Sequence, residues 1–152
     1  MPHFYLGSLA RFYARIGGVG DLQRETDPEV ISGAVSAWRH WLNKELPHPL
    51  DWDESPTAPF DDAAVGDSDW QALCRAAGQP EQLVKPSLWL PGDHDFLFEV
   101  RDLREELVCV GASNELAKSL AGLPEMPGLA VLRTLARRSV EYRLPLIARF
   151  DL

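Results

Sequence analysis

The residues that could do chemistry are concentrated in an acidic stretch between Glu45 and Cys74. This stretch contains no Lys or Arg. The other 15 acidic residues are matched by the 15 Lys and Arg residues elsewhere, so the stretch accounts for the whole net charge of -8. Three large aromatic side chains, Trp52, Phe60 and Trp70, are interleaved with its carboxylates. Aromatic residues anchor many protein interfaces, and complementary charge accelerates encounter. The stretch therefore predicts a surface that binds a basic protein partner.

We expect this surface to combine aromatic anchors with the acids around them: Asp51, Trp52, Asp53, Glu54, Phe60, Asp61, Asp62, Asp67 and Asp69. The alternative is that the aromatic residues pack on the protein's own core while the acids keep a loop solvated. Carboxylates so close in sequence also suit a hard cation such as Ca²⁺ or Mg²⁺. The spacing of an EF-hand, with its glycine and terminal glutamate, is absent. We predict no metal and no cofactor.

Two other short segments could carry catalysis. Asp93, His94 and Asp95 place a histidine between carboxylates, which suits a general base, but their position between two predicted strands is typical of a solvated turn. The turn from Cys109 to Ser113 follows a predicted strand and precedes a helix, where an anion could bind. Neither segment belongs to a metal-ligand or nucleophile motif. We predict no catalytic residue, and keep a small enzyme using one of these segments as the alternative.

The charge balance also bears on nucleic acid, membrane and location. The predicted helix over 128–142 and its end carry Arg133, Arg137, Arg138 and Arg143, which could form an RNA-facing stripe or could pair with the acidic stretch and with Glu141. The overall acidity repels nucleic acid and anionic membrane. No apolar run approaches the roughly 20 residues that span a bilayer, and no secretory signal is visible. Cys74 and Cys109 have apolar neighbours, as expected for free thiols in a reducing cytoplasm. Residue usage rich in Arg, Ala and Leu suggests a bacterial protein.

The elements that must position these residues follow from apolar spacing and from capping or turn residues. Helical spacing predicts helices over 8–16, 28–46, 69–77, 114–121 and 128–142. Ser68 and Ser113 are the expected N-caps of the third and fourth helices. Apolar runs bounded by turn residues predict strands over 88–90, 96–100, 107–110 and 146–150. Residues 47–66 contain four prolines without periodicity and predict a long acidic loop.

This order of elements predicts an α+β fold in a single domain over residues 1–152. We expect a small mixed or mainly antiparallel sheet from the C-terminal half, packed against helices, and a mainly helical N-terminal part. Strands 88–90 and 96–100 should form a hairpin with a longer loop. A helical crossover would allow strands 107–110 and 146–150 to pair in parallel.

The function that these patterns favour is a non-enzymatic binding protein. Small, acidic proteins without catalytic motifs are similar in composition to immunity proteins, which neutralise a toxin, and we predict an inhibitor of immunity or antitoxin type. A third interpretation is a structural or assembly subunit, which would present a large apolar patch to a symmetric partner. The sequence leaves the oligomeric state open.

Overall fold

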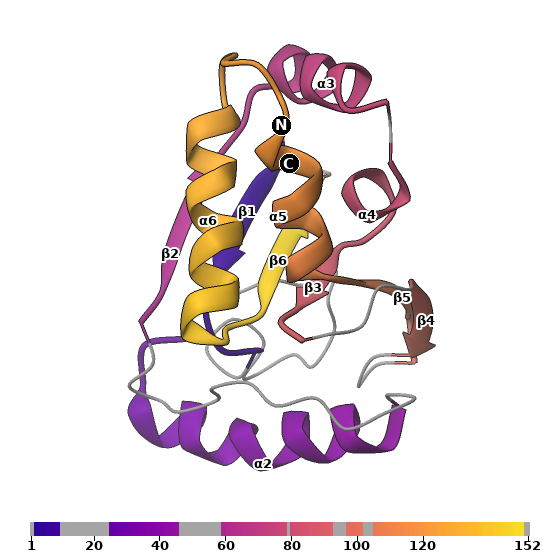
Figure 1. Cartoon of the computed structure of the whole chain (residues 1–152). Coiled ribbons are helices and arrows are strands. Elements are labelled where there is room, and N and C mark those ends of the chain that lie inside the picture. The colour runs from indigo at the N-terminus through magenta and orange to yellow at the C-terminus, as the bar shows by residue number, and fades with distance from the viewer. Residues whose placement is uncertain are drawn as a thin grey trace.

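The computed structural model describes residues 2–9, 25–45, 59–78, 80–92, 97–101 and 105–150. Its centre is a six-stranded mixed sheet in the order β2-β1-β6-β3-β5-β4 (Figure 1). Neighbouring strands are antiparallel except β3 and β5, which are parallel. The strands are β1 (His3–Leu6), β2 (Asp61–Ala64), β3 (Leu88–Leu90), β4 (Phe98–Arg101), β5 (Leu107–Ala112) and β6 (Leu146–Arg149).

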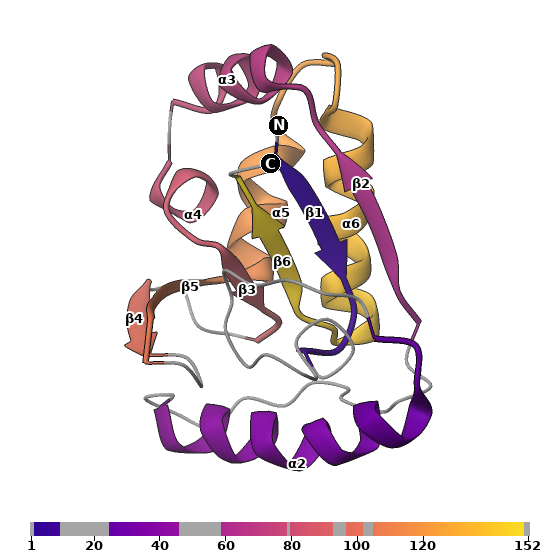
Figure 2. The same cartoon turned by 180° about the vertical axis from the view of Figure 1, so that it is seen from behind.

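Most helices lie on one face of the sheet and one helix packs on part of the other, so alternate strand residues contribute to two cores. On one face, Trp89 and Leu146 join a core built with α3, α4, α5 and α6. On the other face, Leu88, Leu90 and Ile147 pack with α2, which crosses beneath the sheet (Figure 2). This alternation is the expected result of the two-residue period of a strand. The helices are α2 (Pro28–Glu45), α3 (Asp67–Ala76), α4 (Glu81–Val84), α5 (Ser113–Ala121) and α6 (Leu129–Tyr142).

Helix α2 forms where the sequence predicts it. The Glu29 N–H donates to Asp27 Oδ1 at 3.0 Å, which is a side-chain cap of the first turn. The apolar stripe of α2 buries Ile31, Trp38 and Trp41 against the sheet. Helices α3, α5 and α6 also lie within one or two residues of their predicted bounds.

The expected division into a helical N-terminal part and a C-terminal sheet is wrong. Strand β1 lies at the start of the chain and pairs with both β2 and β6. Strand β2 occupies part of the predicted loop over 47–66, while residues 46–58 lie outside the described part of the chain. Asp and Ala are poor strand formers, so β2 depends on its pairing with β1 rather than on propensity. The α+β class and the mixed, mainly antiparallel sheet are confirmed.

The predicted pairing of the C-terminal strands is also wrong. Strands β3 and β4 form no hairpin, because β5 lies between them and pairs with both. The one parallel pair among the described strands is β3 with β5, whereas β6 is antiparallel to β1 and β3. Pairing between strands distant in sequence depends on the packing of the whole domain, and apolar runs alone do not encode it.

Two expected helix caps are replaced, and one short helix was not predicted. The N-caps of α3 and α5 are Gly66 and Ala112, and neither makes a side-chain cap hydrogen bond. Ser113 is instead fully buried, with its Oγ 2.6 Å from Ser139 Oγ of α6. Helix α4 has a single turn and follows Pro80. Of the predicted helix over 8–16, residues beyond Leu9 lie outside the described part.

Candidate partner-binding edge of the sheet

Strand β2 lies at one edge of the sheet, and its register with β1 shows which backbone groups face outward. The Val65 N–H donates to the Pro2 carbonyl at 2.9 Å, and Leu6 pairs with Asp61. In an antiparallel ladder, hydrogen-bonded positions alternate. The backbone groups of Asp62 and Ala64 therefore point away from β1. Within the described residues, no strand pairs with this outer side of β2.

The two aspartates that begin β2 point to opposite faces of the sheet, as the strand period requires. Asp61 faces α6, and its Oδ2 accepts from Arg138 Nη1 at 2.8 Å. Its Oδ1 accepts the outward N–H of Asp62 at 2.8 Å. Asp62 faces the other side, where its Oδ2 lies 3.4 Å from His3 Nε2 and its side chain is 51% exposed. Both predicted site residues are thus about half exposed, Asp61 paired with the protein's own Arg138 and Asp62 beside His3.

A polar cluster surrounds Asp62 on its face of the sheet. The rings of His3 and Tyr5 stack with centroids 4.4 Å apart and an interplanar angle of 7°. Burial, followed by the nearby Asp62 carboxylate, raises the pKa of Tyr5, and Arg149 opposes this effect. The cluster gives β2 an exposed carboxylate held against an aromatic surface.

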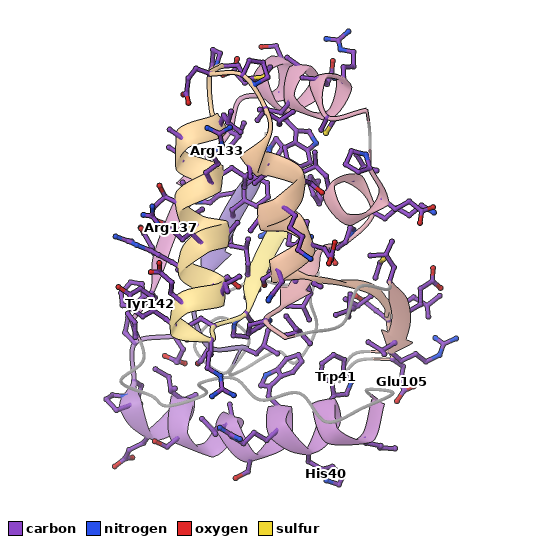
Figure 3. All side chains as sticks on the ribbon, in the orientation of Figure 1. His40, Trp41, Glu105, Arg133, Arg137 and Tyr142 are labelled. Atoms are coloured by element: carbon purple, nitrogen blue, oxygen red, sulfur yellow. The ribbon has the colours of Figure 1, made fainter. Side chains whose placement is uncertain are left out.

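A cavity of about 310 Å³ lies on the other face of β2, beside the Asp61–Arg138 ion pair. Its apolar part is partly exposed, since Phe60 is 39% and Tyr142 52% accessible. Figure 3 shows Tyr142 at the C-terminal end of α6, the helix that runs beside β2. The lining residues are Leu6, Pro59, Phe60, Asp61, Arg138 and Tyr142.

The other members of the predicted surface, and Trp70 of the same acidic stretch, divide into three groups. Asp67 and Asp69 lie in the first turn of α3, which directly follows β2. Trp70 is partly buried in the protein's own core, with ring centroids 5.5 Å from Phe4 and 5.6 Å from Phe150. The remaining members lie outside the described part of the chain: Asp51, Trp52, Asp53 and Glu54. The structure therefore brings Phe60, Asp61 and Asp62 together on β2 and its entry.

The opposite edge of the sheet, β4, carries a side-chain cap. By the alternation of the β5 ladder, the Glu99 and Arg101 backbone groups of β4 face outward. The Trp41 indole N–H donates to the outward Arg101 carbonyl, and Trp41 rises from α2 near the β4 end of the sheet in Figure 3. The Arg101 guanidinium also donates to the Glu105 carbonyl at 2.9 Å. The α2 side chain thus occupies part of the β4 edge.

The Cys109–Ser113 turn does not have the features of an activated nucleophile. Burial, then the charge of Glu99, raises the pKa of the Cys109 thiol, which keeps it protonated at neutral pH. Ser113 is fully buried in its contact with Ser139. Asn114, which the sequence did not single out, accepts the Gly92 N–H at 3.2 Å and ties β3 to α5. Asp93, His94 and Asp95 lie outside the described residues.

Two arginines of α6, Arg133 and Arg138, contact other elements of the protein itself, whereas Arg137 lies 4.0 Å from Glu141 of its own helix. Arg133 donates to the Leu120 carbonyl at 2.9 Å and to the Leu123 carbonyl at 2.6 Å, which satisfies the C-terminal end of α5. Arg138 pairs with Asp61. Through these contacts, Arg133 and Arg138 hold α6 against α5 and β2.

Sequence reasoning missed His3 and Tyr142 as members of this region, because both reach β2 through tertiary structure, His3 from across the β1–β2 ladder. The pairing of Arg138 with Asp61, 77 residues away, agrees with the alternative that the basic face of this helix pairs with the acidic stretch. The signal in the sequence that could have indicated Tyr142 is a large aromatic residue at the end of an amphipathic helix, outside its apolar stripe.

Comparison with known protein families, curated proteins and solved structures finds no match to this chain. No described helix is long and apolar enough to cross a membrane. Among the residues that the structure places, no group of three or more His, Cys, Asp or Glu side chains is arranged to hold a metal ion. The β2 edge is therefore the feature of the molecule from which we infer a function.

Proposed function

We propose that this chain is a non-enzymatic binding protein that engages a basic protein partner through its β2 edge. An extended segment of the partner would add to β2 as a further strand, in the manner of β-augmentation. The observation that carries this proposal is an edge strand with outward backbone groups and two aspartates at its start.

The backbone supports such pairing at three groups. The Asp62 carbonyl and the Ala64 N–H and carbonyl point outward, whereas the Asp62 N–H is already bonded to Asp61. Edge strands with unpaired groups are templates for an added strand, and natural proteins protect them with charges or side chains. At β4 the Trp41 side chain gives such protection. At β2 the charges repel an acidic strand and attract a basic one.

The charge distribution supports a basic partner. The whole excess of -8 lies in the stretch from Glu45 to Cys74, and β2 and the start of α3 belong to that stretch. Asp62 is half exposed on β2, and Asp67 and Asp69 follow in the first turn of α3. Such a field accelerates encounter with cations and disfavours a second acidic copy of this chain.

A basic enzyme that donated this strand from beside its active site would be inhibited, which is how an immunity or antitoxin-type protein acts. The proposal places the protein in the cytoplasm, where the free thiols of Cys74 and Cys109 would stay reduced.

Substitution of Ala64 by proline tests the proposal. The Ala64 N–H faces away from β1, so Ala64→Pro removes an outward donor while leaving the β1 ladder intact. Ala64→Thr is the matched control, because it keeps the N–H and favours a strand. A library of random ten-residue peptides displayed on phage is selected on the full-length wild-type chain and on both variants.

We expect wild type and Ala64→Thr to enrich peptides of net positive charge, and Ala64→Pro to lose that enrichment. Circular dichroism and thermal unfolding verify that both variants are folded. No enrichment on wild type, enrichment of neutral or acidic peptides, or equal enrichment on a folded Ala64→Pro variant would overturn the proposal.

A further inference from the structure

The cavity beside Asp61 indicates which partner side chain the β2 edge selects. We propose that it receives an arginine side chain from the strand that adds to β2. This inference depends on the proposed function and deepens it, since it names the residue type that the edge distinguishes from other cations.

The register brings the partner residue to the cavity. In a paired strand, side chains directly opposite one another lie on the same face, with Cβ atoms about 4.5–5.5 Å apart. Asp61 points toward α6, on the face where the cavity lies. The partner residue opposite Asp61 must therefore project toward the same cavity. This follows from the strand pairing and does not depend on the rest of the partner's sequence.

The cavity walls suit a guanidinium better than an ammonium. Phe60 and Tyr142 present partly exposed rings, and Leu6 and Pro59 supply aliphatic wall. Arginine stacks its planar head on aromatic rings and forms directed hydrogen bonds, whereas lysine is a compact and strongly hydrated charge. A long apolar stem with a planar cationic end thus matches apolar walls that lead to a carboxylate.

Asp61 has acceptor capacity left for the incoming group. Its two oxygens each accept one hydrogen bond within the chain, from the Asp62 N–H and from Arg138. An ionised carboxylate offers about four acceptor positions, so it can be shared between two guanidinium groups. The side chain of Arg138 is 42% exposed, so water screens its repulsion of a second cation.

Four blocked ten-residue peptides test the inference on the full chain. They alternate threonine with arginine, lysine, citrulline or phenylalanine, so that only the side chain facing the cavity and its equivalents differ. Citrulline keeps the shape of arginine without its charge. Binding is measured by fluorescence anisotropy to wild type, to Phe60→Ala/Tyr142→Ala, and to Val131→Ala. Val131 is an exposed apolar residue of α6 outside the cavity lining, which makes it the control.

We expect wild type and Val131→Ala to bind the arginine peptide on the order of tenfold more tightly than the lysine peptide. The double variant should bind both about equally, while still binding them. Equal binding of arginine and lysine by wild type, tightest binding of citrulline or phenylalanine, or an arginine preference retained in the double variant would overturn the cavity assignment. Failure of wild type to bind either basic peptide would overturn the proposed function as well.

Discussion

The Asp61 carboxylate contacts both the backbone of β2 and helix α6, and it also lines the cavity. It bonds the outward N–H of Asp62, pairs with Arg138 of α6 and borders the cavity. Both partners of the ion pair are close to half exposed, and exposed pairs contribute less than about 1 kcal/mol. Asp61 therefore matters more for the shape and charge of the edge than for stability.

The buried hydroxyl of Ser139 is a stronger stabilising residue. Its Oγ lies 2.6 Å from Ser113 Oγ and 2.6 Å from the Leu144 carbonyl. A hydroxyl has one hydrogen, so Ser139 donates to the carbonyl and accepts from Ser113. We predict that Ser139→Ala lowers the free energy of unfolding by about 1–3 kcal/mol, because two buried polar groups lose their partner. Urea unfolding measures this loss.

Thr134→Ala is the matched control for Ser139→Ala, since its hydroxyl bonds the Ala130 carbonyl on the exposed side of the same helix. Its cost should stay within about 0.5 kcal/mol. An equal cost for both variants would contradict the assigned role of Ser139.

The two cysteines lower the free energy of unfolding as the pH rises into the alkaline range. Burial raises the pKa of both Cys74 and Cys109 above the ordinary value of about 8.5. The unfolded chain therefore loses these protons at lower pH than the folded chain, so their contribution is complete below that value and is lost as pH rises through the folded pKa. We predict that Cys74→Ala/Cys109→Ala loses less unfolding free energy between pH 8 and 10 than wild type does. An equal or larger loss of unfolding free energy in the double variant would contradict this prediction.

Helix α6 is fixed along β2 at both of its ends. Arg138 reaches Asp61 near the C-terminal end, and Gly128 precedes the first turn with φ 84°, in the left-handed region. A Cβ at Gly128 would lie 3.0 Å from Val65 Cγ1, just after β2. The glycine thus permits both the left-handed turn and the close approach of the helix to the strand.

Substitution of Gly128 should loosen this contact. We predict that Gly128→Ala lowers the free energy of unfolding by about 1–2 kcal/mol, from the left-handed φ alone. Gly33→Ala is the opposite control, because Gly33 lies inside α2 with nothing within 4 Å of the added Cβ. It should stabilise by about 0.5–1 kcal/mol. The same sign of change in both variants, measured by urea unfolding, would contradict this account.

An element can be predicted from the sequence when the residues that stabilise it lie within its own segment. Helix α2 was readable because its cap and apolar stripe are contained in its own segment. Strand β2 was not, since Asp-Asp-Ala-Ala has neither β-propensity nor apolar alternation. The sequence offers Asp61 and Asp62 as charged site candidates, but their opposite orientations emerge only from the pairing with β1.

At the scale of the molecule, part of the acidic stretch lies at the β2 edge, since Asp61 and Asp62 begin β2 and Asp67 and Asp69 lie in the first turn of α3. The two cores bury alternate faces of the sheet, and within the described residues no strand pairs with the outer side of β2 or of β4. One edge is capped by Trp41, and the other is flanked by acids. Our proposal is therefore that a basic, extended partner adds to β2.

Amide hydrogen exchange at Ala64 tests this claim most directly, with the peptide that alternates threonine and arginine as the ligand. In the free protein the Asp62 amide should already be protected by Asp61, while the outward Ala64 amide exchanges rapidly. Saturating peptide should slow exchange at Ala64 by at least roughly tenfold, because its N–H enters a new ladder. Saturated binding with unchanged exchange at Ala64 would contradict strand addition at β2.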